Sequence, residues 1–143
     1  MRQGFARLFV RAGDAQRPPS IADHVTAQGV ADHALRPNVL FALDLVRDGD
    51  AARITAQAWQ TLVFPWGVTT LDPADPGFHP YHFAPGCWHK DAAYHNGAVW
   101  PWLDGIAIER MVEFGQVERA WQLFHARRRP ALQRGVGGGL PEK

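Results

Sequence analysis

Cysteine, serine and an excess of charge of either sign are what this chain of 143 residues has least of. Cys87 is its one cysteine, so no internal disulfide can form, which excludes a disulfide-stapled scaffold and makes a reducing, cytoplasmic compartment the expectation. The one serine, Ser20, lies outside any Gly-x-Ser-x-Gly motif, which excludes a serine-hydrolase elbow. With 15 Lys and Arg against 14 Asp and Glu, we expect no nucleic-acid partner and no membrane partner, because both require a concentrated basic surface.

Long apolar runs are also lacking. No stretch approaches the roughly 20 residues that span a bilayer, and Arg2 and Arg7 interrupt the short apolar stretch at the start, so we expect neither a membrane helix nor a secretion signal. A hydrophobic content of 46% with 20% charged residues excludes a disordered tail or a coiled coil. Residues 1–143 are therefore expected to form a single domain.

Helical periodicity predicts an all-α fold. Pro37 suits the first turn of a helix, and the cations of Arg127–Arg129 with Pro130 suit a helix end. The periodic faces place Leu40, Leu43, Ile106, Met111 and Phe124 on buried or partner-facing stripes. The expected helices cover residues 1–12, 39–46, 51–64, 99–114 and 117–126.

The segments between these helices carry the unusual residues. Residues 21–35 are predicted to be a loop or extended segment that carries Asp23, His24 and Asp32, and residues 68–71 are β-favourable but too short to indicate a sheet. Residues 72–96 form an expected loop of about 25 residues, a length that in compact domains is usually functional.

The stretch from Asp91 to Trp102 has the chemistry of a sugar site. Tyr, His, Asn and Asp side chains hydrogen-bond hydroxyl groups, and indole faces match the C–H faces of sugar rings. The alternative is a capped helix start, with Asn96 as the N-cap and the tryptophans in the core. The predicted substrate-binding residues are Asp91, Tyr94, His95, Asn96 and Trp100, with Tyr81, His82 and Asn38 around them.

A metal site is the weaker alternative. His79, His82 and His89 could together bind zinc, but the pattern does not lie on a helix and Cys87 has no second thiol to join it. The sequence also lacks both glycine-rich nucleotide-binding fingerprints. We therefore expect no metal and no cofactor.

Three strings resemble one known family. LRPNVLFAL (35–43), GVTTLDPADPGFHPYH (67–82) and DAAYHNGAVWPWLDG (91–105) are similar, in order and spacing, to the glucosidase domain of the glycogen-debranching, amylo-α-1,6-glucosidase family. The resemblance implies an (α/α)6 toroid whose helix-connecting loops line a pocket. It also implies an α-glucan oligosaccharide or polysaccharide as partner and hydrolysis of α-1,6-linked glucose branches by a pair of carboxylates.

The same resemblance bears on catalysis. Gly139-Leu-Pro-Glu142 matches the family segment that carries the catalytic base, so Glu142 is the expected base, although local chemistry alone would make it a solvated terminal residue. No segment of this sequence matches the part of the family domain that carries the general acid. A twelve-helix toroid needs about 350 residues or more, so we expect an incomplete toroid that is inactive in isolation. The competing hypothesis is a non-catalytic sugar-binding or degenerate helical module.

Overall fold

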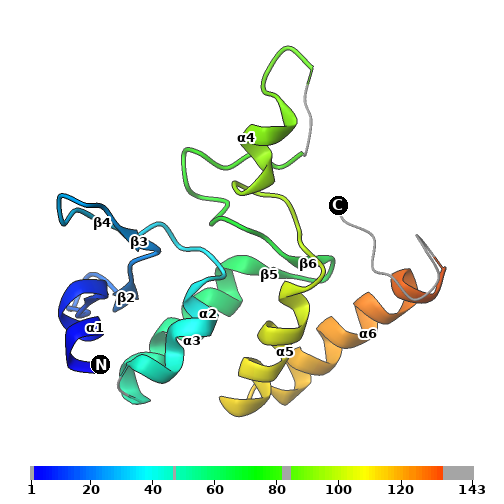
Figure 1. Cartoon of the computed structure of the whole chain (residues 1–143). Coiled ribbons are helices and arrows are strands. Elements are labelled where there is room, and N and C mark those ends of the chain that lie inside the picture. The colour runs from blue at the N-terminus through cyan, green and yellow to red at the C-terminus, as the bar shows by residue number, and fades with distance from the viewer. Residues whose placement is uncertain (1, 47, 82–84, 134–143) are drawn as a thin grey trace.

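The computed structural model describes residues 2–46, 48–81 and 85–133 (Figure 1). About half of the molecule is helical, and in Figure 1 α1 and α6 lie at opposite ends of a row of helices, with α4 apart from that row. The helices are α1 (Arg2–Phe9), α2 (Val39–Ala42), the 3-10 turn η1 (Leu43–Leu45), α3 (Asp48–Leu62), α4 (Lys90–Tyr94), α5 (Leu103–Glu113) and α6 (Val117–Gln133).

Three small antiparallel hairpins accompany the helices, so the all-α expectation is only partly confirmed. Their two-residue strands are too short for any periodicity to show in the sequence. The (α/α)6 toroid stays a prediction from the resemblance. The hairpins are β1 (Val10–Arg11) with β2 (Ser20–Ile21), β3 (His24–Val25) with β4 (Ala31–Asp32), and β5 (Val63–Phe64) with β6 (Gly67–Val68).

Several expected boundaries were wrong, and tertiary contacts explain them. Helix α5 begins at Leu103 rather than near Val99, because Val99 forms an isolated antiparallel bridge with Thr69. Helix α6 continues to Gln133 because Arg127 is not an exposed terminal cation but a buried anchor. The 72–96 segment is not continuous loop, since it contains α4.

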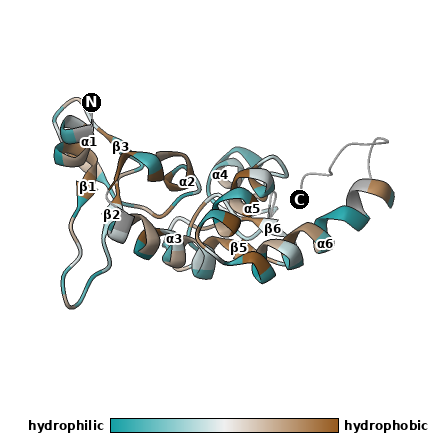
Figure 2. Cartoon of the chain, turned by 90° about the horizontal axis from the view of Figure 1, so that it is seen from below, coloured by the Kyte–Doolittle hydropathy of each residue, from teal (hydrophilic) through white to brown (hydrophobic). Residues whose placement is uncertain are grey.

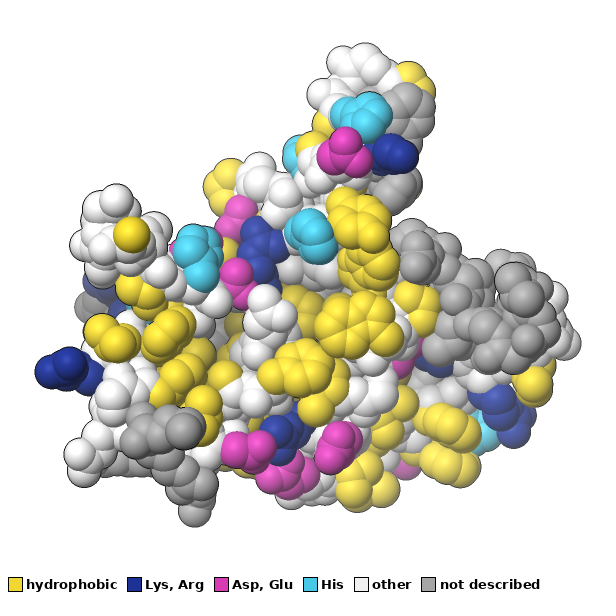
Figure 3. Space-filling view, in the orientation of Figure 1, with side chains coloured by type: hydrophobic (Ala, Val, Ile, Leu, Met, Phe, Trp, Pro, Cys, Tyr) yellow, Lys and Arg dark blue, Asp and Glu magenta, His cyan; other side chains and the backbone are white. Residues whose placement is uncertain are grey.

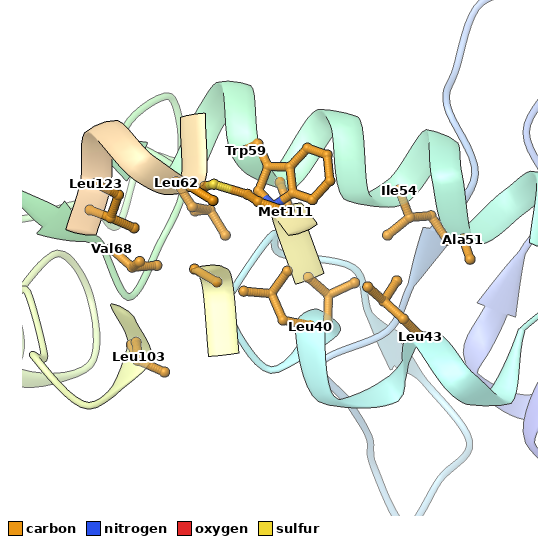
Figure 4. Packing of buried hydrophobic residues seen from close by; sticks show 14 of the residues in the cluster. Leu40, Leu43, Ala51, Ile54, Trp59, Leu62, Val68, Leu103, Met111 and Leu123 are labelled. Atoms are coloured by element: carbon orange, nitrogen blue, oxygen red, sulfur yellow. The ribbon is translucent and has the colours of Figure 1, made fainter. Parts of the chain in front are cut away.

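The hydrophobic core lies between α2, α3, α5 and α6 (Figure 4). Leu40, Leu62 and Met111 are almost fully buried, and burying such a side chain contributes about 1.5–3 kcal/mol. Figure 2 shows that α3, α5 and α6 each carry hydrophobic and hydrophilic positions, as amphipathic helices do. The predicted burial is confirmed for Leu40, Leu43 and Met111; Ile106 packs against the core half-buried, and Phe124 is 44% exposed.

Two buried arginines attach α5 to its neighbours. Arg110 on α5 donates from Nε to the carbonyl oxygen of Leu40 (3.0 Å) and from Nη2 to Asp44 (2.8 Å). Arg127 on α6 donates to Asp104 at the start of α5 (2.6 Å), and both side chains are only 5% exposed. Burial raises the pKa of Asp104, while its hydrogen bond with Arg127 acts in the opposite direction.

None of the helices in the described residues could span a membrane. Within residues 2–46, 48–81 and 85–133, no helix combines the length and hydrophobicity needed to cross a bilayer.

Replacing Arg127 by methionine should destabilise the fold in a pH-dependent way. The change leaves the Asp104 carboxylate buried without its cation, so we expect a loss of about 3–5 kcal/mol in unfolding free energy near neutral pH. Because the folded-state pKa of Asp104 is raised, the penalty is complete above that pKa and shrinks as pH falls through it. Urea unfolding at several pH values measures this.

The matched control is Arg129→Met, on the same helix but exposed. Surface changes of this kind usually stay within about 0.5 kcal/mol. Equal losses in the two variants, or a loss that does not depend on pH, would contradict the role given to the buried pair.

Candidate functional site

A cavity of about 320 Å³ lies where the β3–β4 hairpin, the start of α2 and the segment before α5 meet. Its volume is at the lower end of the roughly 300–1,000 Å³ found for small-molecule sites. In Figure 3, histidine, arginine and acidic side chains gather on the visible face beside a group of hydrophobic side chains. The lining residues are Asp23, His24, Asp32, Arg36, Pro37, Asn38, Thr70, His95, Trp100, Trp102 and Leu103.

The β3–β4 hairpin brings two carboxylates to one side of the cavity. The register pairs His24 with Asp32, and the backbone N–H of Asp23 donates to the carbonyl oxygen of Asp32 (2.8 Å). The Nδ1 atom of His24 lies 3.7 Å from a carboxylate oxygen of each aspartate. Asp23 also accepts a hydrogen bond from Nδ2 of Asn38 (2.8 Å). This side of the cavity is therefore rich in hydrogen-bond acceptors.

Arg36 joins three segments around the cavity. One terminal nitrogen of its guanidinium donates to the carbonyl oxygens of Thr70 (3.3 Å) and His95, and the other donates to Oδ1 of Asn96 (2.8 Å). Its Nε lies 3.8 Å from a carboxylate oxygen of Asp23. The planar fork of an arginine can serve several acceptors at once, which a lysine ammonium cannot do in this geometry.

Gly97 allows the two loops behind the cavity to approach closely. Its backbone has φ +144°, and a Cβ atom at this position would collide with the carbonyl oxygen of His79. Its N–H donates to Oγ1 of Thr70 (2.9 Å), and the N–H of His79 donates to the carbonyl oxygen of Asn96 (2.6 Å). The backbone that presents His95 is thus fixed from both sides.

The aromatic part of the lining consists of the rings of His95, Trp100 and Trp102. The ring planes of His95 and Trp100 are within 18° of parallel with centroids 6.4 Å apart, and Tyr94 packs edge-on against Trp100 at 4.3 Å. The indole Nε1 of Trp100 donates to the carbonyl oxygen of Tyr94 (2.9 Å), which fixes the ring. A lining that combines flat rings with carboxylates and an arginine offers both an apolar surface and hydroxyl partners, as a sugar requires.

The structure brings three of the sequence-predicted residues together in this cavity: Asn38, His95 and Trp100. Asn96 lies behind the lining, where Arg36 binds its side chain. Tyr94 also lies outside the lining, packed against the rings of His95 and Trp100.

Four further residues fall outside the cavity or outside the described chain. The Asp91 side chain is 79% exposed and lies 3.1 Å from Nδ1 of His89, away from the lining, and Tyr81 is 69% exposed. His82 and Glu142 lie outside the described residues. Their roles stay predictions. Asn96 is not an N-cap, because α5 begins seven residues later.

The structure adds lining residues that were not among the predicted substrate-binding residues: Asp23, His24, Asp32, Arg36, Thr70 and Trp102. Only a weak signal could have indicated these lining residues before the structure was known. Acidic and imidazole groups flank a short segment with Gly29 at φ +81°, which is typical of a hairpin that would place its two ends side by side.

No metal cluster is found in the part of the chain that the structure describes. Of the three histidines of the zinc hypothesis, His79 stacks on Trp88 with centroids 4.6 Å apart, and His89 lies beside Asp91.

Replacing Arg36 by lysine should loosen the cavity. A single ammonium cannot reach all the acceptors that the guanidinium serves, so we expect unfolding free energy to fall by roughly 1–3 kcal/mol and amide exchange at residues 95–97 to accelerate. Arg53→Lys, at an exposed position on α3, is the control and should change neither. If Arg36→Lys protects residues 95–97 as well as the wild type does, Arg36 does not hold this segment.

The sequence is similar to those of known proteins. The family described as amylo-alpha-1,6-glucosidase matches residues 1–142. A glycogen debranching enzyme of Saccharomyces cerevisiae is 31% identical over an alignment that covers 71% of this chain and 7% of the yeast protein. The chain thus spans a small part of the length of that curated relative, and it matches the family over nearly all of its own length. The chain belongs to the amylo-alpha-1,6-glucosidase family.

Proposed function

We propose that this chain forms part of the substrate pocket of a glycoside hydrolase that removes α-1,6-linked glucose branches from glycogen-like α-glucans. The observation that carries the proposal is that three segments of the sequence meet at one cavity. Three separate segments of the sequence, 35–43, 67–82 and 91–105, carry the family resemblance, and all three contribute to one cavity. Arg36 and Asn38 come from the first, Thr70 from the second, and His95 and Trp100 from the third.

The lining supports a neutral sugar as the ligand. A glucose ring presents hydroxyl groups around its rim and C–H groups on its faces, so it needs acceptors and donors at the edge and an apolar ring beside it. Asp23 and Asp32 supply acceptors, Arg36 and Asn38 supply donors, and Trp100 supplies the face. Opposite charges lie within one site, which disfavours a strongly charged ligand and suits a polyhydroxylated neutral one.

Hydrolysis requires a general acid and a general base. In an inverting glycosidase the two carboxyl groups lie roughly 6.5–9.5 Å apart, with room between them for the attacking water. We propose Glu142 as the base, on its match to the family segment. We propose that the acid comes from a part of the complete enzyme that this chain does not include, which is consistent with the chain spanning 7% of the yeast relative.

Sugar binding by the chain itself is the first test of the proposal. Glucose titrated into the protein should quench or enhance tryptophan fluorescence, because Trp100 lines the cavity. In His95→Ala, which removes one lining hydrogen-bonding group, the dissociation constant should rise about 3–10-fold. Asp91→Asn is the matched control, since Asp91 lies outside the lining, and its affinity should stay within about twofold of wild type. A loss in Asp91→Asn with none in His95→Ala would move the sugar site away from this cavity.

Glu142→Gln tests the catalytic assignment in a longer protein of this family that contains this chain and releases glucose. Glutamine keeps the shape of the side chain and cannot accept a proton, so the rate should fall about 10²–10⁴-fold while substrate affinity changes far less. Glucose release from a branched α-glucan measures the rate. Retained activity in Glu142→Gln, together with lost activity in Asp91→Asn, would reverse the assignment.

A further inference from the structure

Two large aromatic side chains remain exposed next to the cavity. Trp102, in the turn before α5, is 62% exposed, and Phe41 on α2 is 48% exposed. Their ring centroids lie 6.0 Å apart with planes tilted by 39°. Adjacent exposed rings leave apolar surface in water that a bound ligand would cover.

This aromatic pair is continuous with the cavity. Trp102 lines the cavity directly. Phe41 follows the lining residue Asn38 by three positions, and the N–H of Phe41 donates to the carbonyl oxygen of Asn38 (3.1 Å). An extended ligand that leaves the cavity towards α2 would therefore pass directly onto the rings of Trp102 and Phe41.

We propose that Phe41 and Trp102 form a second subsite, which binds the sugar units attached to the one in the cavity. The inference rests on the proposed function, because it takes the cavity as the site of the terminal branch sugar. The ligand class is a neutral α-glucan chain, whose successive rings present C–H faces to aromatic side chains. The glucan that carries the branch is thereby held beside the bond that is broken.

The contrast with other exposed aromatic residues supports this choice of surface. Trp121 (57% exposed) and Phe124 (44% exposed) stack on each other on α6, and neither lines the cavity. Trp102 also borders a groove of about 450 Å³ between α5 and α6, whose lining includes Ile108, Phe124 and Leu132. That groove gives the glucan a competing route, which the experiment separates from the route over Phe41.

The experiment compares two probes on the full 143-residue chain: glucose, and a maltopentaose that carries one α-1,6-linked glucose. Dissociation constants come from calorimetry, and the quantity of interest is the affinity of the branched probe relative to that of glucose. In Phe41→Ala and in Trp102→Ala this ratio should fall about 3–10-fold, the range expected when one aromatic stacking contact is lost. Trp102→Phe should retain most of the ratio because it keeps a ring, whereas Trp102→Leu should not.

Matched controls exist for both positions. Trp121→Ala removes a tryptophan of similar exposure, and Phe124→Ala removes a phenylalanine of similar exposure, so both should leave the ratio as in the wild type. Thermal unfolding of every variant verifies that the fold is intact.

The possible failures are distinguishable. If glucose binds and the ratio is unchanged in Phe41→Ala and Trp102→Ala, the subsite is overturned and the proposed function stands. If the ratio falls in Phe124→Ala but not in Phe41→Ala, the glucan lies along the α5–α6 groove, which also overturns the subsite. If Trp102→Leu has the same affinity ratio as the wild type, Trp102 does not stack on the glucan and the subsite is overturned. If neither probe binds the wild type, the proposed function is overturned and the subsite with it.

Discussion

The guanidinium of Arg36 is the interaction on which the candidate site depends. It donates to backbone carbonyls of two segments, at Thr70 and His95, and to the side chain of Asn96. Segments without regular structure have few hydrogen bonds of their own, so their carbonyl groups are paired by donors from elsewhere. One planar, permanently charged group meets this need for both loops and faces the acidic hairpin at Asp23. The side chain of Arg36 itself lines the cavity.

Helix α5 gives this arrangement a rigid base. Arg110 connects it to α2 and η1, and Asp104 connects it to Arg127 on α6. The hydrogen bonds that Arg110 donates to Asp44 and Glu113 raise the pKa of Arg110, so its charge is held over the whole accessible pH range. Because these contacts fix the start of α5, they also fix the turn that presents Trp100 and Trp102. A site built at the end of a fixed helix keeps its geometry better than one carried by free loops.

What the sequence could predict follows from the range of each interaction. Burial of Leu40 and Met111 follows from a periodicity of 3.6 residues, which is a local property, and the structure confirms it. Helix α6 was predicted too short because the basic run at 127–129 resembles a helix end. The destination of Arg127 is an aspartate 23 positions away in the chain, which no local pattern reveals.

The candidate site shows the same limit of local sequence patterns. Asp91 and His95 lie on one short helix and its C-cap, and composition alone assigned them the same role. The structure separates them, since Asp91 lies near the first turn beside His89, whereas the carbonyl of His95 is bound by Arg36. Asp23 and Asp32 reach the cavity through hairpin register and the Asn38 contact, both of which require the folded chain.

The geometry of the cavity bears on the binding part of the proposed function. The described cavity residues are tied to one another: Asp23 to Asn38, Arg36 to two carbonyls, and Trp100 to the carbonyl of Tyr94. Groups that already have partners are suited to hold a sugar in one orientation, because their positions do not change when it binds. A general base must instead exchange a proton with water during each turnover and needs a freer environment. The binding role proposed for the cavity therefore rests on its geometry, whereas the catalytic role proposed for Glu142 rests on the family resemblance of its sequence segment.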